Sequence, residues 1–282
     1  MIRLPIIAGF GGINTAGRSS GHHGYRRMVI EALSKEKALE TRAAIAALTG
    51  KLKRKSEGWV DNEGNAVDLA SYITAISGEL DQNTLIRELE DNLFDPNQLN
   101  YHCRANLAST NDRGIEFELK KKQLPTPLPA GWSIKSDTPD DPNKVRVNIE
   151  QSFEVLLECF RKTDVNSAGQ LPTGFKPELL YQARNHPRAL QLTVYAASDA
   201  INSLGMDWEI IRQHVPPDQI GVYAGSAMGQ LDYNGFGGLL QARLLGKKVT
   251  SKQMPLGYAE MPSDFINAYL LGNLGTNGTN VA

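Results

Sequence analysis

Residues Arg3–Arg27 read RLPIIAGFGGINTAGRSSGHHGYRR, and the interpretation of this stretch decides the fold. Its apolar run Leu4–Ala8 is short and bounded by glycine, which is typical of a buried strand. A glycine-rich turn follows, and then a polar, basic segment with two adjacent histidines. The stretch is compatible with a phosphate-binding loop, a metal site or the first edge of a larger α/β fold.

The spacing of the glycines does not favour a dinucleotide-binding loop. The motif G-x-G-x-x-G needs a third glycine where the helix packs against the strand, and counting from Gly9 this position is Asn14. A helix would also have to begin at once so that its N-terminus faces the pyrophosphate, whereas NTAGRSSGHHG delays any helix. The Walker pattern is absent from the sequence.

The histidines do not indicate a metal site. His22 and His23 are adjacent, so their rings point in different directions on most backbones, and no nearby Cys, Asp or Glu completes a ligand set. His102 is similarly isolated beside Cys103. We therefore expect surface or hydrogen-bonding roles for these histidines and no bound metal.

No residue is predicted to be an activated nucleophile. Gly225 directly precedes Ser226 in YAGSAMG, so the elbow pattern G-x-S-x-G is not met. Ser226 is instead expected at a strand end, where small residues allow another backbone to approach. Cys159 lies in an apolar run and is expected to pack as a small hydrophobe. Neither His186 nor His214 belongs to a recognisable acid/base set.

Composition indicates a globular protein of one large domain or two ordinary ones. The 282 residues are 41% apolar and 22% charged, with a net charge of -1, so no global field favours nucleic acid or an anionic membrane. No apolar run approaches the ~20 residues of a membrane helix. The N-terminus lacks a signal peptide's cleavage site. Two cysteines in such a chain suggest a reducing compartment, and we predict a cytoplasmic protein.

Periodicity predicts alternating strands and helices, which argues for an α/β fold with a mixed or parallel sheet. Proline-rich segments between about residues 56 and 143 interrupt regular structure. FEVLLECF is compatible with a strand or a short helix, and KLKRKSEGW with a basic, solvated turn. The expected strands are Leu4–Ala8, Val145–Ile149 and part of Asp218–Gln230, and the expected helices are Tyr25–Leu48, Leu85–Leu99, His186–Gly205 and Met261–Gly275, the last with Ser263 as a possible N-cap and Gly272 or Gly275 near its end.

Several of these pieces occur together, in order, in one family. GFGGINTAGR follows the first strand, with Gly9, Gly11 and Gly17 matching the opening V-x-G-x-G-x-x-x-x-x-G, and IGVYAGSAMG resembles IG-x-x-x-G-S-x-x-G. VYAASDAINSLG, MPSDFINAYLLG and GTNGTNVA complete the series. The chain thus resembles the N-terminal half of a β-ketoacyl-[acyl-carrier-protein] synthase, a condensing enzyme of thiolase-like fold, and specifically a long bacterial member that carries an insertion.

The resemblance implies a thiolase-like half with a mixed five-stranded sheet and helices. It covers about Met1–Met28 and Gly174–Ala282. We therefore expect a core of about residues 1–30 and 145–282, and an α-rich insertion of about residues 31–144. GFGGINTAGR is then a tight turn after the first strand.

The implied reaction is a decarboxylative Claisen condensation of an acyl-thioester with malonyl-carrier protein, without metal or organic cofactor. In the family a cysteine in A-C-x-(T/S) accepts the acyl group shortly after the strand that corresponds to TNVA, whereas this chain ends at Ala282. Neither Cys103 nor Cys159 falls at that position. The expectation is an N-terminal fragment without catalytic residues, itself inactive.

The implied partners are acyl carrier protein, acyl-thioesters and a second copy in a homodimer, with no nucleic acid and no membrane. Candidates for the acyl pocket or the subunit contact are Ser226, Met228, Met254 and Met261; ordinary core packing is the alternative for the three methionines. Two other functions remain open: a non-catalytic partner subunit of a condensing enzyme, and a nucleotide-binding oxidoreductase.

Overall fold

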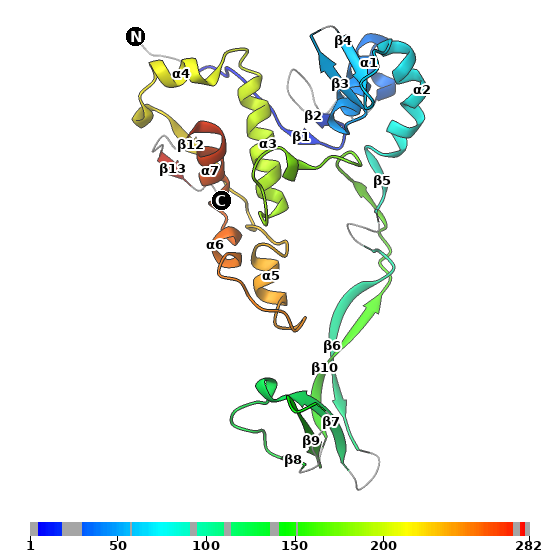
Figure 1. The fold of residues 1–282 in the computed structure, drawn as a ribbon, viewed down its shortest axis with the longest axis vertical. Helices are drawn as coiled ribbons and strands as arrows, with labels where there is room; N and C mark the ends of the chain where they lie inside the picture. The colour runs from blue at the N-terminus through cyan, green and yellow to red at the C-terminus, as the bar shows by residue number, and fades with distance from the viewer. Residues whose placement is uncertain are drawn as a thin grey trace. The chain divides into compact units, whose positions relative to one another are not determined.

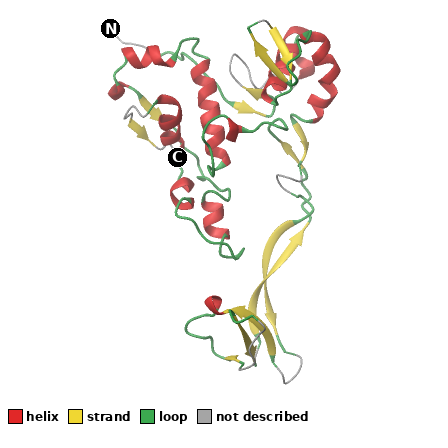
Figure 2. Ribbon diagram, viewed as in Figure 1, coloured by secondary structure: helices red, strands yellow, loops and turns green. Residues whose placement is uncertain are grey.

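Helices and strands occur throughout the chain in a computed structural model, which describes residues 5–18, 30–56, 58–90, 95–109, 114–135, 141–150, 152–272 and 277–279 (Figures 1 and 2). The chain forms two compact units. The first combines residues 1–88 with residues 167–282, and the second consists of residues 89–166. The chain therefore leaves the first unit once, forms the second, and returns.

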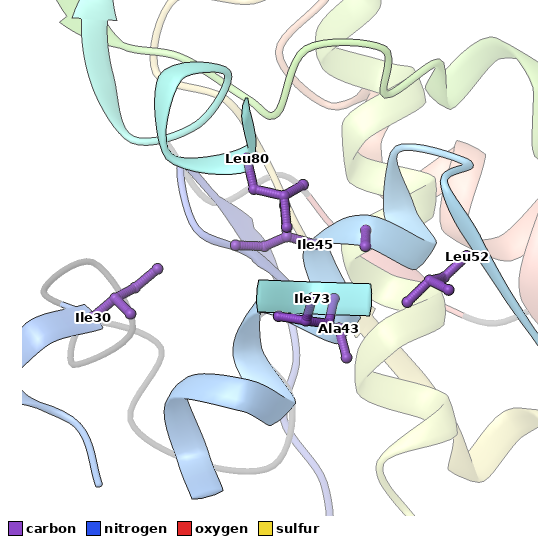
Figure 3. Close-up of a cluster of buried hydrophobic side chains, with 7 residues drawn as sticks. Ile30, Ala43, Ile45, Leu52, Ile73 and Leu80 are labelled. Carbon is purple, nitrogen blue, oxygen red and sulfur yellow. The ribbon is translucent and has the colours of Figure 1, made fainter. Parts of the chain in front are cut away.

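A pair of packed helices and a β-hairpin form the first part of the first unit. Helix α1 (Lys35–Leu48) packs against α2 (Leu69–Gln82), and the hairpin of β3 (Leu52–Lys55) and β4 (Gly58–Asp61) lies between them in sequence. Figure 3 shows the apolar side chains that the helices and hairpin bury together. The fully buried members of this cluster are Ile30, Ala43, Ile45, Ala46, Leu52, Ile73 and Leu80.

Side-chain caps fix where these two helices begin. Ser34 accepts a hydrogen bond from the backbone N–H of Lys37, and Asp68 accepts one from Ser71. Each cap satisfies a backbone donor that the first turn leaves unpaired. The bond from Ser71 lowers the pKa of Asp68. The helix expected over Tyr25–Leu48 is thus shorter, and residues 25–29 lie outside the described residues. KLKRKSEGW forms a hairpin, not a turn.

The N-terminal segment packs against α3 (Arg188–Asn202). Its short hairpin consists of β1 (Ile13–Asn14) and β2 (Gly17–Arg18). The side chain of Asp199, which is fully buried, accepts a hydrogen bond from the N–H of Gly12 and pairs with Arg18, whose Nε lies 2.5 Å from Oδ1. Two elements 180 residues apart in sequence are thereby held together by one carboxylate.

The strand expected at Leu4–Ala8 is not formed by the described residues 5–8. Ile6 is 86% exposed and Ile7 is 89% exposed. The physical reason is that a strand needs a hydrogen-bonded neighbour, and no described strand pairs with this run. Leu4 lies outside the described residues.

Two short strands of the first unit, one just before the second unit in sequence and one just after it, pair with each other. Strand β5 (Ile86–Glu88) pairs antiparallel with β11 (Ser167–Gly169), and Arg87 donates to Leu171 O and Thr173 Oγ1. The helix predicted over Leu85–Leu99 is therefore wrong. Its apolar residues satisfy helical spacing, but the backbone of Ile86–Glu88 finds its hydrogen bonds across to a strand from much later in the chain.

The C-terminal part of the first unit is mostly helical. It places Leu190, Val194 and Phe265 in a second apolar cluster, where α3 meets α7. Its further elements are α4 (Trp208–His214), β12 (Gly221–Tyr223), α5 (Phe236–Gln241), α6 (Gln253–Gly257), α7 (Met261–Ile266) with a π-turn over Asn267–Leu271, and β13 (Asn277–Thr279).

Predictions for this part are largely confirmed. The helix expected over His186–Gly205 is α3. The helix expected from Met261 ends at Gly272, in the left-handed conformation that glycine favours. Ser263 is not its N-cap, because Glu260 holds that position and the Ser263 Oγ donates to Glu260 O. Strands β12 and β13 pair in parallel, with Tyr223 opposite Thr279. The end of TNVA, residues 280–282, lies outside the described residues.

The second unit is built from strands. A ribbon of β6 (Leu99–Leu107) and β10 (Phe153–Arg161) pairs antiparallel over nine residues. A three-stranded sheet has β9 (Lys144–Ile149) between β7 (Ile115–Lys120) and β8 (Trp132–Ile134). Phe117, Trp132 and Phe153 form an aromatic cluster with ring centroids 5.3–6.0 Å apart. VRVNI is a strand as predicted, and FEVLLECF is a strand and not a helix.

The arrangement of strands corrects the expected fold in two respects. The part of the chain that the structure describes holds only two-stranded pairs and one three-stranded sheet, and no mixed five-stranded sheet. The region of residues 31–144, expected to be an α-rich insertion, holds α1 and α2 but also β3–β8. The two units meet at residues 88–89 and 166–167 instead of at about 30 and 144.

Gly11 gives a direct test of the contact between the N-terminal segment and α3. A Cβ at Gly11 would lie 2.2 Å from Ala200 N, which is helix backbone and cannot yield. We expect Gly11→Ala to lower the free energy of unfolding by at least ~2 kcal/mol, as overpacking does. Gly78→Ala in α2, where an added Cβ meets nothing within 4 Å, should raise it by ~0.5–1 kcal/mol. Urea unfolding of both variants measures this; equal effects would contradict the contact.

Candidate functional site: a tight loop, an aromatic cavity and a basic surface

The loop that follows β12 is held against the connection between α6 and α7. The N–H of Ser226 donates to Ala259 O at 3.0 Å, and the N–H of Gln230 donates to Gly257 O at 2.9 Å. Gly229 has a φ of +67°, and a Cβ there would lie 2.3 Å from Gly257 O. Only glycine fits this close approach of two backbones, as was expected for the small residues of GSAMG.

Two of the four predicted site residues make contacts within the fold. The Ser226 Oγ donates to Gly229 O at 3.2 Å and so closes the loop. Met261 is half-buried and packs on the cluster of Leu190, Val194 and Phe265. For Met261 the structure therefore agrees with the core-packing alternative.

The other two residues are open to solvent. Met228 is 72% exposed at the tip of the loop, and Met254 is 52% exposed on α6. Because the loop is hydrogen-bonded to the segment after α6, the fold brings Ser226 and Met228 to the stretch bounded by Met254 and Met261. In sequence, Ser226 and Met228 precede Met254 by 28 and 26 positions, and the tertiary contact brings the two segments together.

Gln230 is a member of this region that sequence reasoning missed. Its side chain is 1% exposed, and neither its Nε2 nor its Oε1 has a hydrogen-bond partner among the residues that the structure describes. A buried amide left unpaired costs about 1–3 kcal/mol. Its backbone is well anchored, because its carbonyl accepts from Phe236 at 2.8 Å. Nothing in the sequence distinguishes Gln230 from an exposed polar residue.

An aromatic cavity of about 300 Å³ opens beside α3. Tyr181, Tyr195 and Tyr269 line it together with Arg18, whose guanidinium carbon lies 5.9 Å from the centre of the Tyr195 ring. Burial raises the pKa of Tyr195 to about 12 and that of Tyr181 further still. These phenols are therefore neutral hydrogen-bonding groups near neutral pH.

His186 belongs to the aromatic cluster behind this cavity. Its ring centre lies 4.9 Å from that of Phe265 and 5.6 Å from that of Tyr269, and its Nδ1 lies 3.4 Å from the Tyr181 hydroxyl. Burial, and then the charge of Lys252, lower the pKa of His186. The position was assigned from sequence only as the start of a helix. The aromatic residues around it come from segments up to 83 positions away.

A third feature is a basic surface, defined by exposed residues from the end of α5 to the residue before α6. Each of its four cations is exposed, and none forms an ion pair with a carboxylate within the described ranges. Lys247 lies over the ring of Tyr233 at 5.1 Å. Apolar side chains are interspersed with the charges. The basic surface comprises Arg243, Lys247, Lys248 and Lys252 with Leu240, Leu244, Leu245 and Val249.

The chemistry that these features support is binding and positioning. Within the described ranges no group of three or more His, Cys, Asp or Glu is placed to hold a metal ion. Cys103 and Cys159 lie in the second unit, on β6 and β10, and His102 also lies on β6. His22 and His23 lie outside the described residues. Of the helices described, none is long and apolar enough to span a membrane; the cytoplasmic location stays a prediction.

Comparison with known proteins first gives the class. The fold is similar to part of a ketosynthase, because the chain superposes on a ketosynthase crystal structure with a TM-score of 0.87 and 44% sequence identity, over 100% of this chain and 44% of that chain. That structure is the noncanonical ketosynthase FabY from Pseudomonas aeruginosa. No model of a protein family matches the sequence.

In sequence, the chain is similar to the β-ketoacyl-[acyl-carrier-protein] synthase FabY of P. aeruginosa. The two sequences are 45% identical over 279 residues, which is 99% of this chain and 44% of the relative. The resemblance to the β-ketoacyl-[acyl-carrier-protein] synthases is therefore confirmed. The chain spans less than half the length of the curated relative that it matches.

The extent of the match corrects two expectations. The similarity is not limited to residues 1–28 and 174–282, because the alignment runs over nearly the whole chain, including the region expected to be an insertion. The interpretation of the chain as inactive and without catalytic residues also does not hold, because the alignment with a synthase runs over 99% of this chain. The protein matched across this length is a synthase, and the position at which a sequence stops says nothing about activity.

Burial of His186 and the charge of Lys252, which together lower the pKa of His186, predict a pH effect. Because the pKa of folded His186 lies below its ordinary value of 6.5, the unfolded state binds a proton first, and stability is lost as the pH falls below about 6.5. Lys252→Met should raise this pKa part of the way back, since burial remains, and so reduce the loss. NMR titration of the imidazole measures it. Lys248→Met is the control; an equal shift there would refute the assignment.

Proposed function

We propose that the protein is a β-ketoacyl-[acyl-carrier-protein] synthase that joins an acyl-thioester to malonyl-carrier protein in fatty-acid biosynthesis. The observation that carries the proposal is the agreement of sequence and fold across the chain, at 45% identity and a TM-score of 0.87. Neither a dinucleotide motif in the sequence nor any comparison favours the oxidoreductase alternative. Because we propose that the protein itself is catalytically active, the proposal differs from the alternative of a non-catalytic partner subunit.

In the proposed reaction, the acyl group is first transferred from its thioester to an enzyme nucleophile. Malonyl-carrier protein then loses CO2, and the resulting enolate carbon attacks the acyl carbonyl to form the new carbon–carbon bond. The enzyme nucleophile leaves as the β-ketoacyl product forms. The described residues are proposed to contribute to binding in this scheme, and no described residue is assigned a proton-transfer or nucleophilic step.

The reaction is tested by direct detection of the product. The purified protein is incubated with an acyl-coenzyme A and malonyl-carrier protein, and mass spectrometry of the carrier follows the conversion of malonyl to β-ketoacyl groups. We expect CO2 and β-ketoacyl carrier to form in equal amounts. Absence of both from a folded preparation would refute the synthase activity, and CO2 without condensation product would refute the proposed acyl acceptor.

We propose that the carrier protein binds at the basic surface. A carrier presents its acyl group on a phosphopantetheine arm, so a phosphate accompanies every substrate, and anionic ligands are attracted to unpaired cations. The interspersed Leu240, Leu244 and Val249 would contact apolar parts of the partner. The sequence supports this placement. Met254 follows the last residue of the basic surface by two positions, and the connection between α6 and α7, to which the Ser226 loop is hydrogen-bonded, comes next.

Charge reversal tests this placement. The triple variant Arg243→Glu, Lys247→Glu and Lys248→Glu should raise KM for malonyl-carrier protein by roughly tenfold, with kcat nearly unchanged, because rim charges act mainly on association. The effect should shrink at high salt. The matched control reverses Lys53, Arg54 and Lys55, three exposed cations of β3. An equal rise in KM in the control would mean that net charge, and not this surface, attracts the carrier.

Met228 and Met254 remain proposed contacts of the acyl chain or of a second subunit. Their exposure supports this, because methionine is flexible and polarizable and suits adaptable apolar surfaces. Tyr223 and Leu231, on either side of the loop, are exposed as well. We propose that this apolar region is covered in a homodimer, in agreement with the exposed strand β12, whose second edge has no partner among the described strands.

A further inference from the structure

The two cysteines of the chain lie close together in the second unit. Cys103 on β6 is opposite Leu157, and Cys159 on β10 is opposite Tyr101. Successive side chains of a strand point to opposite faces, so both cysteines lie on the same face of the ribbon, in diagonal positions. Their Sγ atoms are 2.9 Å apart, and both side chains are half-buried.

Strand geometry explains the short distance. Diagonal neighbours on an antiparallel pair are usually ~7–8 Å apart at their Cα atoms. A two-stranded ribbon twists more strongly than a larger sheet, and the twist shortens one of the two diagonals. Figure 1 shows β6 and β10 as a long twisted ribbon, and the cysteines occupy its diagonal positions. The thiols were brought together by register and twist, although 56 positions separate them in sequence.

Metal binding does not account for the pair. A thiolate metal site needs three or four ligands, and the described residues contain no group of three candidate ligands. His102 adjoins Cys103 in sequence but points to the opposite face of the ribbon. A hydrogen bond with Cys103, and then burial, raise the pKa of the Cys159 thiol, which agrees with a reduced pair at rest.

We propose that Cys103 and Cys159 are a modification site, at which a low-molecular-weight disulfide such as glutathione disulfide converts the two thiols into a reversible cross-strand disulfide. One thiolate attacks glutathione disulfide, forms a mixed disulfide and releases one glutathione thiolate. The second cysteine thiolate then displaces the other glutathione. The two cysteine sulfurs lose two electrons and two protons in total, and glutathione disulfide gains them as two glutathione thiols.

The native arrangement favours the second step over further reaction with glutathione. In a flexible chain the two thiols would meet at an effective concentration in the millimolar range. In the ribbon their sulfurs are already within 1 Å of the ~2.05 Å bonding distance. The resulting link would fix the register of β6 against β10, whose pairing supports the unit that contains β7–β9.

Peptide mapping of the purified 282-residue protein tests the proposal. The folded protein is equilibrated in glutathione buffers, quenched with acid, alkylated and digested with trypsin without reduction. Cleavage after Arg and Lys places Cys103 in the peptide 88–104 and Cys159 in the peptide 147–161. We expect a cross-linked pair of these peptides, two hydrogens lighter than their sum, which increases with the oxidised share of glutathione and disappears with dithiothreitol.

Two comparisons separate a built site from chance reactivity. The ratio of cross-linked to reduced protein should be at least about tenfold higher in the native protein than in urea. The double variant Cys103→Ser with His102→Cys keeps two thiols but moves one to the opposite face, and it should not form the cross-link. Glutathione added separately to each cysteine, equal cross-linking in urea, or equal cross-linking in the double variant would each overturn the proposal.

Discussion

The buried carboxylate of Asp199 is the interaction on which the first unit depends. It accepts the N–H of Gly12 and the guanidinium of Arg18, and it is fully shielded from water on α3. A buried charge is tolerated only when it is paired and hydrogen-bonded. The N-terminal segment must therefore lie along α3. Gly11 must lack a side chain, because it lies against the backbone of that helix.

That constraint also positions the candidate site. Arg18 reaches the aromatic cavity beside Tyr195 because Asp199 holds it there. Helix α3 also packs on Phe265 of α7, and the segment between α6 and α7 is hydrogen-bonded to the loop of Ser226 and Gln230. The cavity, the loop and the basic surface all belong to the first unit, in which α3 lines the cavity and contacts α7.

The second unit follows a different rule. Its described residues form no α-helix that could cover the ribbon, and an isolated pair of strands is only marginally stable in water. The aromatic cluster of Phe117, Trp132 and Phe153 stabilises one end of the ribbon. Farther along it, the two thiols lie on the same face. A disulfide at that point would stabilise the ribbon away from its aromatic cluster.

The sequence by itself determined the elements whose hydrogen bonds are local. Helix α3, the end of α7 at Gly272 and strand β9 follow from periodicity and caps, and the ordered motifs predicted a resemblance to the β-ketoacyl synthases, which the similarity to FabY confirmed. Only the tertiary structure decided the rest. Ile86–Glu88 became a strand, Ile6 and Ile7 stayed exposed, and Met228, Gln230 and His186 acquired their neighbours through contacts between distant segments. Such contacts depend on which distant segment lies nearby in the folded chain, and a local pattern of residues does not predict them.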